Sequence, residues 1–317
     1  MDYIPLSDNA ARQVIDSSTI FKEYTRVHAL SQSYCGGMYW KQDAGYTYLV
    51  KTAPDNRQKR LGVRSAQSEQ IYLEFTTHKR ELEARFASLR GQLRDAERLN
   101  KALKVGRVPS TVVAVLQSIE AAGLGEHFTV VGTHALYAYE AAASVRMVQG
   151  ALATQDVDLL WDARRRVQFM TDMKKLDSSM LRVLQTADAT FERKESQNET
   201  AINAKGFEVD FLRRQPVDGD PHPFRFSSDE GDWWPVQALC ASVLTSAPRF
   251  EHIVIAATGR MTRMRTVAPS SFIEFKQWMS THATHREPAK RRRDLLQALI
   301  VQSLIDDGLL VVQAGLR

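Results

Sequence analysis

The sequence predicts a mixed α/β (α+β) protein, in which a small mixed sheet with helices is preceded by a helical arm and followed by a helical cap. Short alternating segments typical of strands are interleaved with helix-like segments between residues 107 and 225, as in a compact α/β core. A stripe of apolar residues at three- and four-residue steps runs from Ile71 to Leu99, which predicts one long helix packed against a partner helix. Helical spacing returns after Pro269 and continues to Ile305.

Breaks in these patterns divide the chain into three regions. Residues 1–106 are expected to form an N-terminal helical region with a β-hairpin, whose turn is Gln42-Asp43-Ala44-Gly45. Residues 107–225 form the expected core, because Val105-Gly106 ends the long helix and Pro109 opens the next one. Residues 226–317 are expected to hold a second hairpin and the C-terminal helices.

The composition is that of an ordinary globular protein. Hydrophobic residues make up 44% and charged residues 25% of the 317 positions, which argues against a disordered chain. No run reaches the roughly 18 apolar residues of a membrane span, and Met1 to Pro5 lacks a signal pattern, so we expect no membrane partner and a cytoplasmic location. A net charge of +5 and a pI near 9.2 favour a polyanionic partner such as RNA.

Two aspartates in the core region indicate metal chemistry. Asp156 and Asp158 lie in the alternating run Thr154 to Trp161, and a strand places residues two apart on the same face. Neighbouring carboxylates repel one another unless a cation or a shared proton relieves the repulsion, and carboxylate oxygen is the ligand that Mg²⁺ prefers. The pair therefore predicts a metal site.

A glycine turn upstream predicts a site for phosphate. The apolar strand Phe128 to Val131 is followed by Gly132 and Thr133 and then by a helix-like segment. Glycine permits close approach of an anion, the first amides of a helix face it, and the threonine hydroxyl adds a donor.

A third carboxylate follows on the next alternating strand, Gly206 to Leu212. Asp210 and Glu208 share one face of this strand, so either could complete a metal site with the aspartate pair.

In this order, the three elements resemble the polymerase-beta-like nucleotidyltransferase superfamily. Its pattern of a glycine turn into a helix, an Asp-x-Asp and a later single Asp is matched here by Val131-Gly132-Thr133, Asp156-Val157-Asp158 and Asp210. Thr133 stands where the family has Ser or Gly, and a hydroxyl is kept. The resemblance favours Asp210 over Glu208 as the third carboxylate, and it covers residues 111 to 295.

The resemblance also implies roles in the C-terminal region. Pro269, Phe272, Phe275, Lys276 and the run Lys290-Arg291-Arg292-Arg293-Asp294 are similar to the helical signature of stand-alone bacterial members, among them toxins of toxin–antitoxin and abortive-infection systems. In these relatives a helix lysine contacts the nucleotide triphosphate, and Lys276 is the matching position.

The activity implied by the resemblance is transfer of a nucleoside monophosphate from ATP or another NTP to a hydroxyl acceptor. Asp156, Asp158 and Asp210 would bind two Mg²⁺ or Mn²⁺ ions and act as the catalytic residues. Gly132, Thr133 and Lys276 would bind the nucleotide.

The acceptor stays open between several classes. A tRNA or other RNA 3′ end or a protein side chain would suit a toxin or phage-defence component, with a cognate antitoxin or self-association through the N-terminal helix. The alternatives are a small-molecule (antibiotic) adenylyltransferase and a non-catalytic NTP- or RNA-binding module of the same fold. Contacts to acceptor phosphates are expected from Arg286, Lys290, Arg291 and Asp294, although a basic run is also typical of a solvated helix face.

Overall fold

Contacts between residues divide the chain into two compact units. The computed structural model describes residues 2–152, 154–217, 220, 222–238, 241–283 and 286–311. One unit comprises residues 12–103 and the other comprises residues 1–11 together with 104–317. Within the described ranges, no helix combines the length and the apolar character needed to cross a bilayer.

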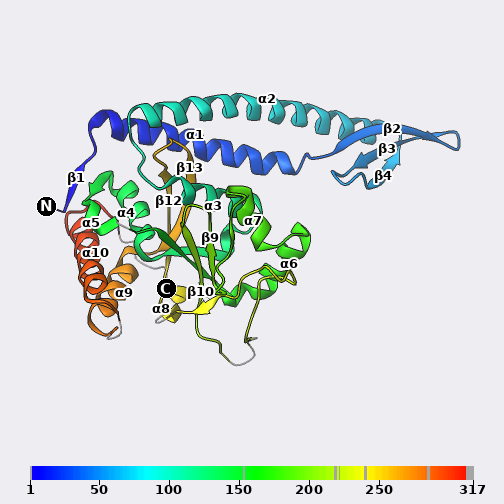
Figure 1. Ribbon diagram of the computed structural model, residues 1–317. Helices are drawn as coiled ribbons and strands as arrows, with labels where there is room; N and C mark the ends of the chain where they lie inside the picture. The colour runs from blue at the N-terminus through cyan, green and yellow to red at the C-terminus, as the bar shows by residue number, and fades with distance from the viewer. Residues whose placement is uncertain are drawn as a thin grey trace. The chain divides into compact units, whose positions relative to one another are not determined.

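The smaller unit is built on two long helices, α1 (Asp8–Gln32) and α2 (Ala66–Ala102). They lie side by side and antiparallel (Figure 1), with Gln13 bonded to Asn100 at 2.9 Å and Tyr24 stacked on Phe86 at a centroid distance of 5.1 Å. Ser65 caps α2 through a reciprocal hydrogen bond with Ser68, which satisfies amides that the first helical turn leaves free. The long helix predicted from the apolar stripe is confirmed.

A three-stranded antiparallel sheet joins these helices. Its order is β2 (Gly37–Asp43), β3 (Tyr46–Thr52) and β4 (Gln58–Val63). The predicted hairpin is β2 with β3. The third strand was missed because Gln58-Lys59-Arg60 has no alternation of polar and apolar residues, so only its backbone pairing with β3 reveals it.

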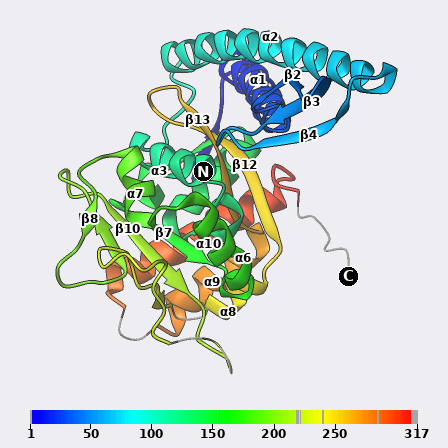
Figure 2. The ribbon, with the colours of Figure 1, turned by 90° about the vertical axis from the view of Figure 1, so that its right-hand side faces the viewer.

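The larger unit contains a mixed sheet that confirms the predicted core. Its path is β5 (Phe128–Val131), β7 (Asp156–Trp161), β10 (Glu208–Arg213), β9 (Thr200–Ile202) and β8 (Glu192–Arg193), with β11 (Val236–Gln237) also paired to β10. The central strands β7 and β10 are parallel, whereas β5 and β9 run antiparallel to their neighbours. Figure 2 shows β7 and β10 adjacent, with β8 farther out.

Helices flank this sheet, and two small strand pairs complete the unit. The α-helices are α3 (Ser110–Ala121), α4 (Leu136–Ala143), α5 (Gln149–Leu152), α6 (Arg166–Leu176), α7 (Met180–Ala187), α8 (Ala241–Ser246), α9 (Pro269–Thr281) and α10 (Pro288–Asp306). Short 3₁₀ turns are η1 (Gly125–His127), η2 (Gly132–Ala135) and η3 (Ala163–Arg165). The strand pairs are the predicted hairpin β12 (Arg249–Ile255) with β13 (Met261–Val267), and β1 (Tyr3–Pro5) with β6 (Val145–Met147). The second pair was missed because strands of three residues carry no readable period.

Strand alternation gives the sheet one apolar face and one face that carries acids. Val157, Leu159 and Trp161 are buried on the first face, where Trp161 packs edge-on against Phe169 of α6 at a centroid distance of 5.5 Å. In Figure 1 the sheet lies between α6 and α7 on one side and α4, α9 and α10 on the other. The residues of β7 with opposite parity, Asp156 and Asp158, therefore point away from the aromatic core.

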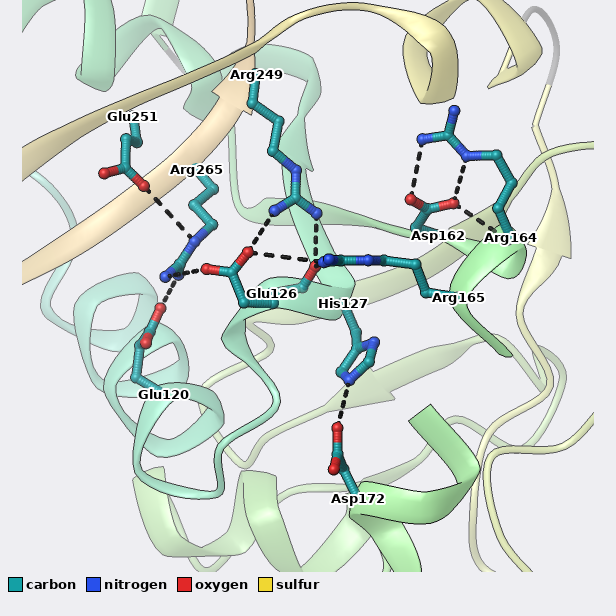
Figure 3. A network of polar contacts seen from close by, with 10 residues as sticks. All are labelled: Glu120, Glu126, His127, Asp162, Arg164, Arg165, Asp172, Arg249, Glu251 and Arg265. Atoms are coloured by element: carbon teal, nitrogen blue, oxygen red, sulfur yellow. Dashed lines mark hydrogen bonds and ion pairs between the residues drawn. The ribbon is translucent and has the colours of Figure 1, made fainter. Parts of the chain in front are cut away.

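An ion network closes the end of the sheet where β7 finishes (Figure 3). Arg265 of β13 pairs with Glu120 and lies 2.9 Å from Glu126, and Arg249 of β12 lies 2.7 Å from Glu126. Directly after β7, Asp162 caps η3 and binds Arg164 through two hydrogen bonds of 2.8 and 2.9 Å. The charges at this end are neutralised within the chain.

Candidate functional site

Three aspartates meet on the acid-bearing face of the sheet. One carboxylate oxygen from each of Asp156, Asp158 and Asp210 lies within 4.8 Å of the other two. The parallel register of β7 and β10 pairs Asp158 with Asp210, and alternation along β7 adds Asp156 on the same face. The structure thus brings together the three aspartates named from the sequence, and their role as metal ligands stays a prediction.

Threonine hydroxyls orient two of these carboxylates. Thr200 of β9, the register partner of Asp210, donates to its Oδ1 at 2.6 Å, and Thr154 donates to Asp156. Sequence reasoning missed both donors. Thr154 had a readable signal, since it stands two residues before Asp156 at the start of the strand, whereas Thr200 is brought in only by pairing between β9 and β10.

The electrostatics of the cluster favour an added cation. Burial, followed by the neighbouring charges of Asp156 and Asp210, raises the pKa of Asp158 to about 7, although Lys276 and Arg286 act in the opposite direction. Burial also raises the pKa of Asp210, against the hydrogen bond from Thr200. Repelling carboxylates at this spacing form a set of hard oxygen donors that fits a divalent cation.

The glycine turn lies directly against this cluster. Gly132 follows β5 with φ at +68°, and a Cβ built on it would lie 2.2 Å from Oδ2 of Asp158. Only glycine fits both the left-handed backbone and the close approach of the carboxylate. The predicted turn into a helix is present as η2 followed by α4.

Thr133 and His134, the two residues that follow Gly132, are buried beneath the turn. The hydroxyl of Thr133 accepts a hydrogen bond of 3.2 Å from Nε2 of Gln297 on α10, which also donates to the Ala151 carbonyl at 2.6 Å. Burial lowers the pKa of His134 to about 4, despite the charge of Asp156, so the ring is neutral at physiological pH. Gln297 thus ties the turn to the C-terminal helix.

Helix α9 and Arg286, which precedes α10, supply cations that line the same cavity as the acids. Lys276 is 2% exposed, and its Nζ lies 2.8 Å from Asp294 and 5.6 Å from the centre of the Phe272 ring. Asp294 is fully buried and also accepts from Nε of Arg286 at 2.6 Å. Burial lowers the pKa of Lys276, and the charge of Asp294 opposes this effect. One carboxylate therefore holds two cations, an arrangement that sequence spacing does not reveal.

Asp156, Asp158, the glycine turn and several C-terminal cations line one cavity of about 250 Å³, whereas Asp210 is not part of its lining. Its wall contains acids from β7, the Gly132 turn and cations from the C-terminal helices, and its lining includes Gly132, Thr133, Asp156, Asp158, Lys276, Arg286, Lys290 and Arg293. Acids that can hold a metal thus face cations that can hold phosphate across one space.

The remaining candidates lie nearby in other environments. Glu208 shares the face of Asp210, but it is engaged by Lys194 at 2.7 Å. Arg291 directs its guanidinium to the end of α9, where it donates to the carbonyls of Ser280 and Thr281 at 2.7 and 3.3 Å.

Comparison with known proteins identifies one family. The model of a family described as nucleotidyltransferase matches residues 110–310. Searches of curated proteins and of solved structures return no match. The matched range contains the glycine turn, all three aspartates and both C-terminal cationic helices, and it covers well over half of the chain. The chain belongs to this nucleotidyltransferase family.

Proposed function

We propose that this protein is a metal-dependent enzyme that transfers a nucleoside monophosphate from an NTP to a hydroxyl acceptor. The observation that carries the proposal is the cluster of Asp156, Asp158 and Asp210 within 4.8 Å of one another. Asp156 and Asp158 line a cavity that is also lined by cations. Mutual repulsion makes such a cluster costly to keep without a ligand. Structural reasons alone give no account of it.

The three aspartates are proposed to hold the metal, as Mg²⁺ or Mn²⁺. Two ions, when bound, would supply charge neutralisation at the triphosphate and lower the pKa of the acceptor hydroxyl. Thr154 and Thr200 fix the carboxylate orientations through their hydrogen bonds, which keeps the donor oxygens directed at one point.

Gly132 and Thr133 are proposed to face the terminal phosphates of the nucleotide. Backbone amides at a turn into a helix attract anions, and the glycine leaves room for them. Lys276, Arg286 and Lys290 line the same cavity and would neutralise charge on the departing group. Asp294 positions the first two of these cations.

The reaction forms one bond and breaks one. The acceptor oxygen attacks the α-phosphorus in line, a new O–P bond forms, and the bond from the α-phosphorus to the bridging oxygen breaks so that pyrophosphate leaves with its electron pair. The acceptor proton is lost to solvent or to a carboxylate of the cluster. Positioning and preorganised charge supply most of the acceleration in such reactions.

We assign RNA, with a tRNA 3′ end as the first acceptor to test. The net charge of +5 and the basic residues Arg286 and Lys290 beside the cavity support a polyanionic acceptor. The similarity of the Pro269 to Asp294 segment to stand-alone bacterial members, which include toxins, extends the proposal to a toxin or phage-defence role.

The test is incubation of the purified protein with each α-³²P-labelled NTP, Mg²⁺ and total tRNA, followed by denaturing electrophoresis. We expect label on tRNA with one preferred NTP and none with the Asp156→Asn variant. Label on the protein itself would move the acceptor to a protein side chain, and label on an added aminoglycoside would move it to a small molecule. No transfer to any of these acceptors, from a protein that folds and binds metal, would contradict the catalytic proposal.

A further inference from the structure

The three-stranded sheet of the smaller unit has one face built from tyrosines and basic residues. Strand pairing places Lys41 opposite Tyr48, and Val50 opposite both Tyr39 and Arg60. Alternation adds Tyr46 and Asp43 to the same face. We call Tyr39, Lys41, Tyr46, Tyr48 and Arg60 the tyrosine face.

The opposite face of the sheet is the one that packs on α2. Trp40 lies against Tyr72 at a centroid distance of 5.6 Å, and Nζ of Lys51 lies 5.4 Å from the centre of the Phe75 ring. Trp40 and Lys51 have the opposite parity to the tyrosine face. Since α2 covers that side, the tyrosine face is directed away from α2.

Two rings of the tyrosine face are exposed, and the third, Tyr48, is half-buried between its neighbours. Tyr39 is 37% and Tyr46 is 62% exposed. Tyr46 and Tyr48 lie 6.4 Å apart between centroids, and the guanidinium of Arg60 lies 4.8 Å above the Tyr48 ring. Exposed tyrosines on neighbouring strands are costly to hydrate and offer flat surfaces on which planar groups can stack.

Charge defines the kind of partner. Residues 37–64 contain six lysines or arginines and two aspartates, so the segment that carries the rings has a net charge of +4. Arg60 pairs with Asp43 on the tyrosine face, whereas Lys41 on this face and Lys59 on the neighbouring edge strand are exposed. A ligand that combines negative charge with exposed planar rings matches both properties.

We infer that the tyrosine face binds an unpaired RNA strand, with bases stacked on the tyrosines and phosphates near Lys41 and Arg60. Exposed aromatic rings on a sheet are a recurrent platform for unstacked bases, and a duplex, whose bases already stack on one another, would not use them. The choice of RNA over DNA rests on the proposed function, whereas the stacking surface itself does not.

The test is fluorescence anisotropy with the full chain and a labelled, unstructured twelve-nucleotide RNA, in EDTA and without NTP. We expect Tyr39→Ala and Tyr46→Ala each to weaken binding by about tenfold, the effect of losing one stacked base. Tyr46→Phe should bind the RNA as tightly as wild type, because it keeps the aromatic ring. Lys41→Gln with Arg60→Gln should lower the salt slope by about 0.7 per lost phosphate contact.

A matched control separates the tyrosine face from general attraction to basic proteins. Arg90 and Arg94 are exposed on α2, so Arg90→Gln with Arg94→Gln removes the same charge from the same unit and should leave the affinity within about twofold, as expected for diffuse attraction alone. An equal loss in this control, or unchanged binding in the tyrosine variants, would overturn the inference.

Competing ligands are distinguished in the same assay. Tighter binding of DNA of the same sequence, or of duplex RNA, would overturn the assignment to unpaired RNA. A change of molecular mass in Tyr46→Ala by light scattering, with unchanged RNA affinity, would assign the face to a second copy of the chain instead. Because the assay contains neither metal nor NTP, loss of nucleotide transfer leaves its result unaffected, and loss of RNA binding leaves transfer to a small acceptor measurable.

Discussion

The aspartates at the two ends of strand β7 have pKa values shifted in opposite directions. At its start, Asp156 and Asp158 lie with Asp210 within 4.8 Å, and burial together with mutual repulsion raises the pKa of Asp158 to about 7. Just past its end, burial acts on Asp162 in the same direction, but the hydrogen bonds and charge of Arg164, together with the charge of Arg249, outweigh it and lower the pKa. In the described part of the chain, an acid cluster without an ion pair thus lies at the start of β7, and an acid paired with an arginine lies just past its end.

The difference distinguishes carboxylates that stabilise the fold through ion pairs from carboxylates that are suited to bind a ligand. Two acids in the network near Asp162, Glu120 and Glu126, each have an arginine partner, so charge is balanced within the chain (Figure 3). Around Asp158 the cations Lys276 and Arg286 are bound to Asp294 rather than to the cluster. Perturbed titration beside a cavity is a property of functional sites, and it directs attention to the start of β7.

The largest effect is expected from Asp158→Asn. We expect nucleotide transfer to fall by about 10³-fold, since several kcal/mol of charge stabilisation depend on the metal-binding acids. The unfolding free energy should stay equal or rise, because the substitution removes a repelled charge. Activity is measured with labelled NTP and stability by urea unfolding. Asp162→Asn is the control. If this variant loses as much transfer activity as Asp158→Asn while its unfolding free energy is that of wild type, the distinction between the two ends of β7 is wrong.

The two ends should also respond to pH with opposite sign. The unfolded Asp158 ionises near its ordinary pKa of 3.8, whereas the native group keeps its proton up to about pH 7. The metal-free protein should therefore lose stability as pH rises from about 4 to 7, by up to about 1.4 kcal/mol per pH unit from this group. Asp162, with a lowered pKa, contributes stability above its ordinary pKa that is lost on further acidification.

The difference in unfolding free energy between wild type and Asp158→Asn isolates the first contribution. We expect this difference to grow from pH 5 to pH 7 in EDTA and to level off above about pH 8, where the native group has also lost its proton. A constant difference across the whole range would contradict the raised pKa.

A glycine pair tests how closely the site is packed. Gly132 and Gly206 have similar positive φ values of +68° and +74°, but only at Gly132 would a Cβ meet Asp158. Alanine at either position should cost roughly 1–2 kcal/mol through backbone strain. Gly132→Ala should in addition reduce transfer by about 10²-fold by displacing the carboxylate. Equal activity in the two variants, measured at matched folded fractions, would argue against the glycine turn as part of the site.

The site could be predicted from sequence where it depends on short-range periodicity. Asp156 and Asp158 share a face because a strand has a period of two, and Gly132 is readable as a break between a strand and a helix. Asp210 required the further expectation that its strand lies beside β7, and the resemblance to a known superfamily supplied it.

The parts that escaped prediction depend on contacts between distant segments. Thr200 reaches Asp210 through the register of β9 and β10. Asp294 binds Lys276 across eighteen residues, and nothing in the basic run around it indicates that the acid is buried while its neighbours are not. Strand β4 likewise lacks an amphipathic period and exists through its pairing with β3.

The smallest effect on nucleotide transfer is expected just past the end of β7, from Arg265→Met. The Arg265 side chain is 8% exposed and contacts Glu120, Glu126 and Glu251. Its loss should lower the unfolding free energy by about 2 kcal/mol, less than for a fully buried pair because the glutamates are 37–53% exposed and water can hydrate them. Arg263→Met, on the same strand with a 38% exposed side chain and one pair to Glu251 at 3.3 Å, should lower the unfolding free energy by less than about 1 kcal/mol.

Nucleotide transfer by the folded fraction should be unchanged in both variants, since neither arginine lines the cavity beside the aspartates. A loss of transfer in Arg265→Met beyond the loss of folded protein would mean that the two ends of β7 are coupled, and the separation between structural and functional carboxylates would then have to be abandoned.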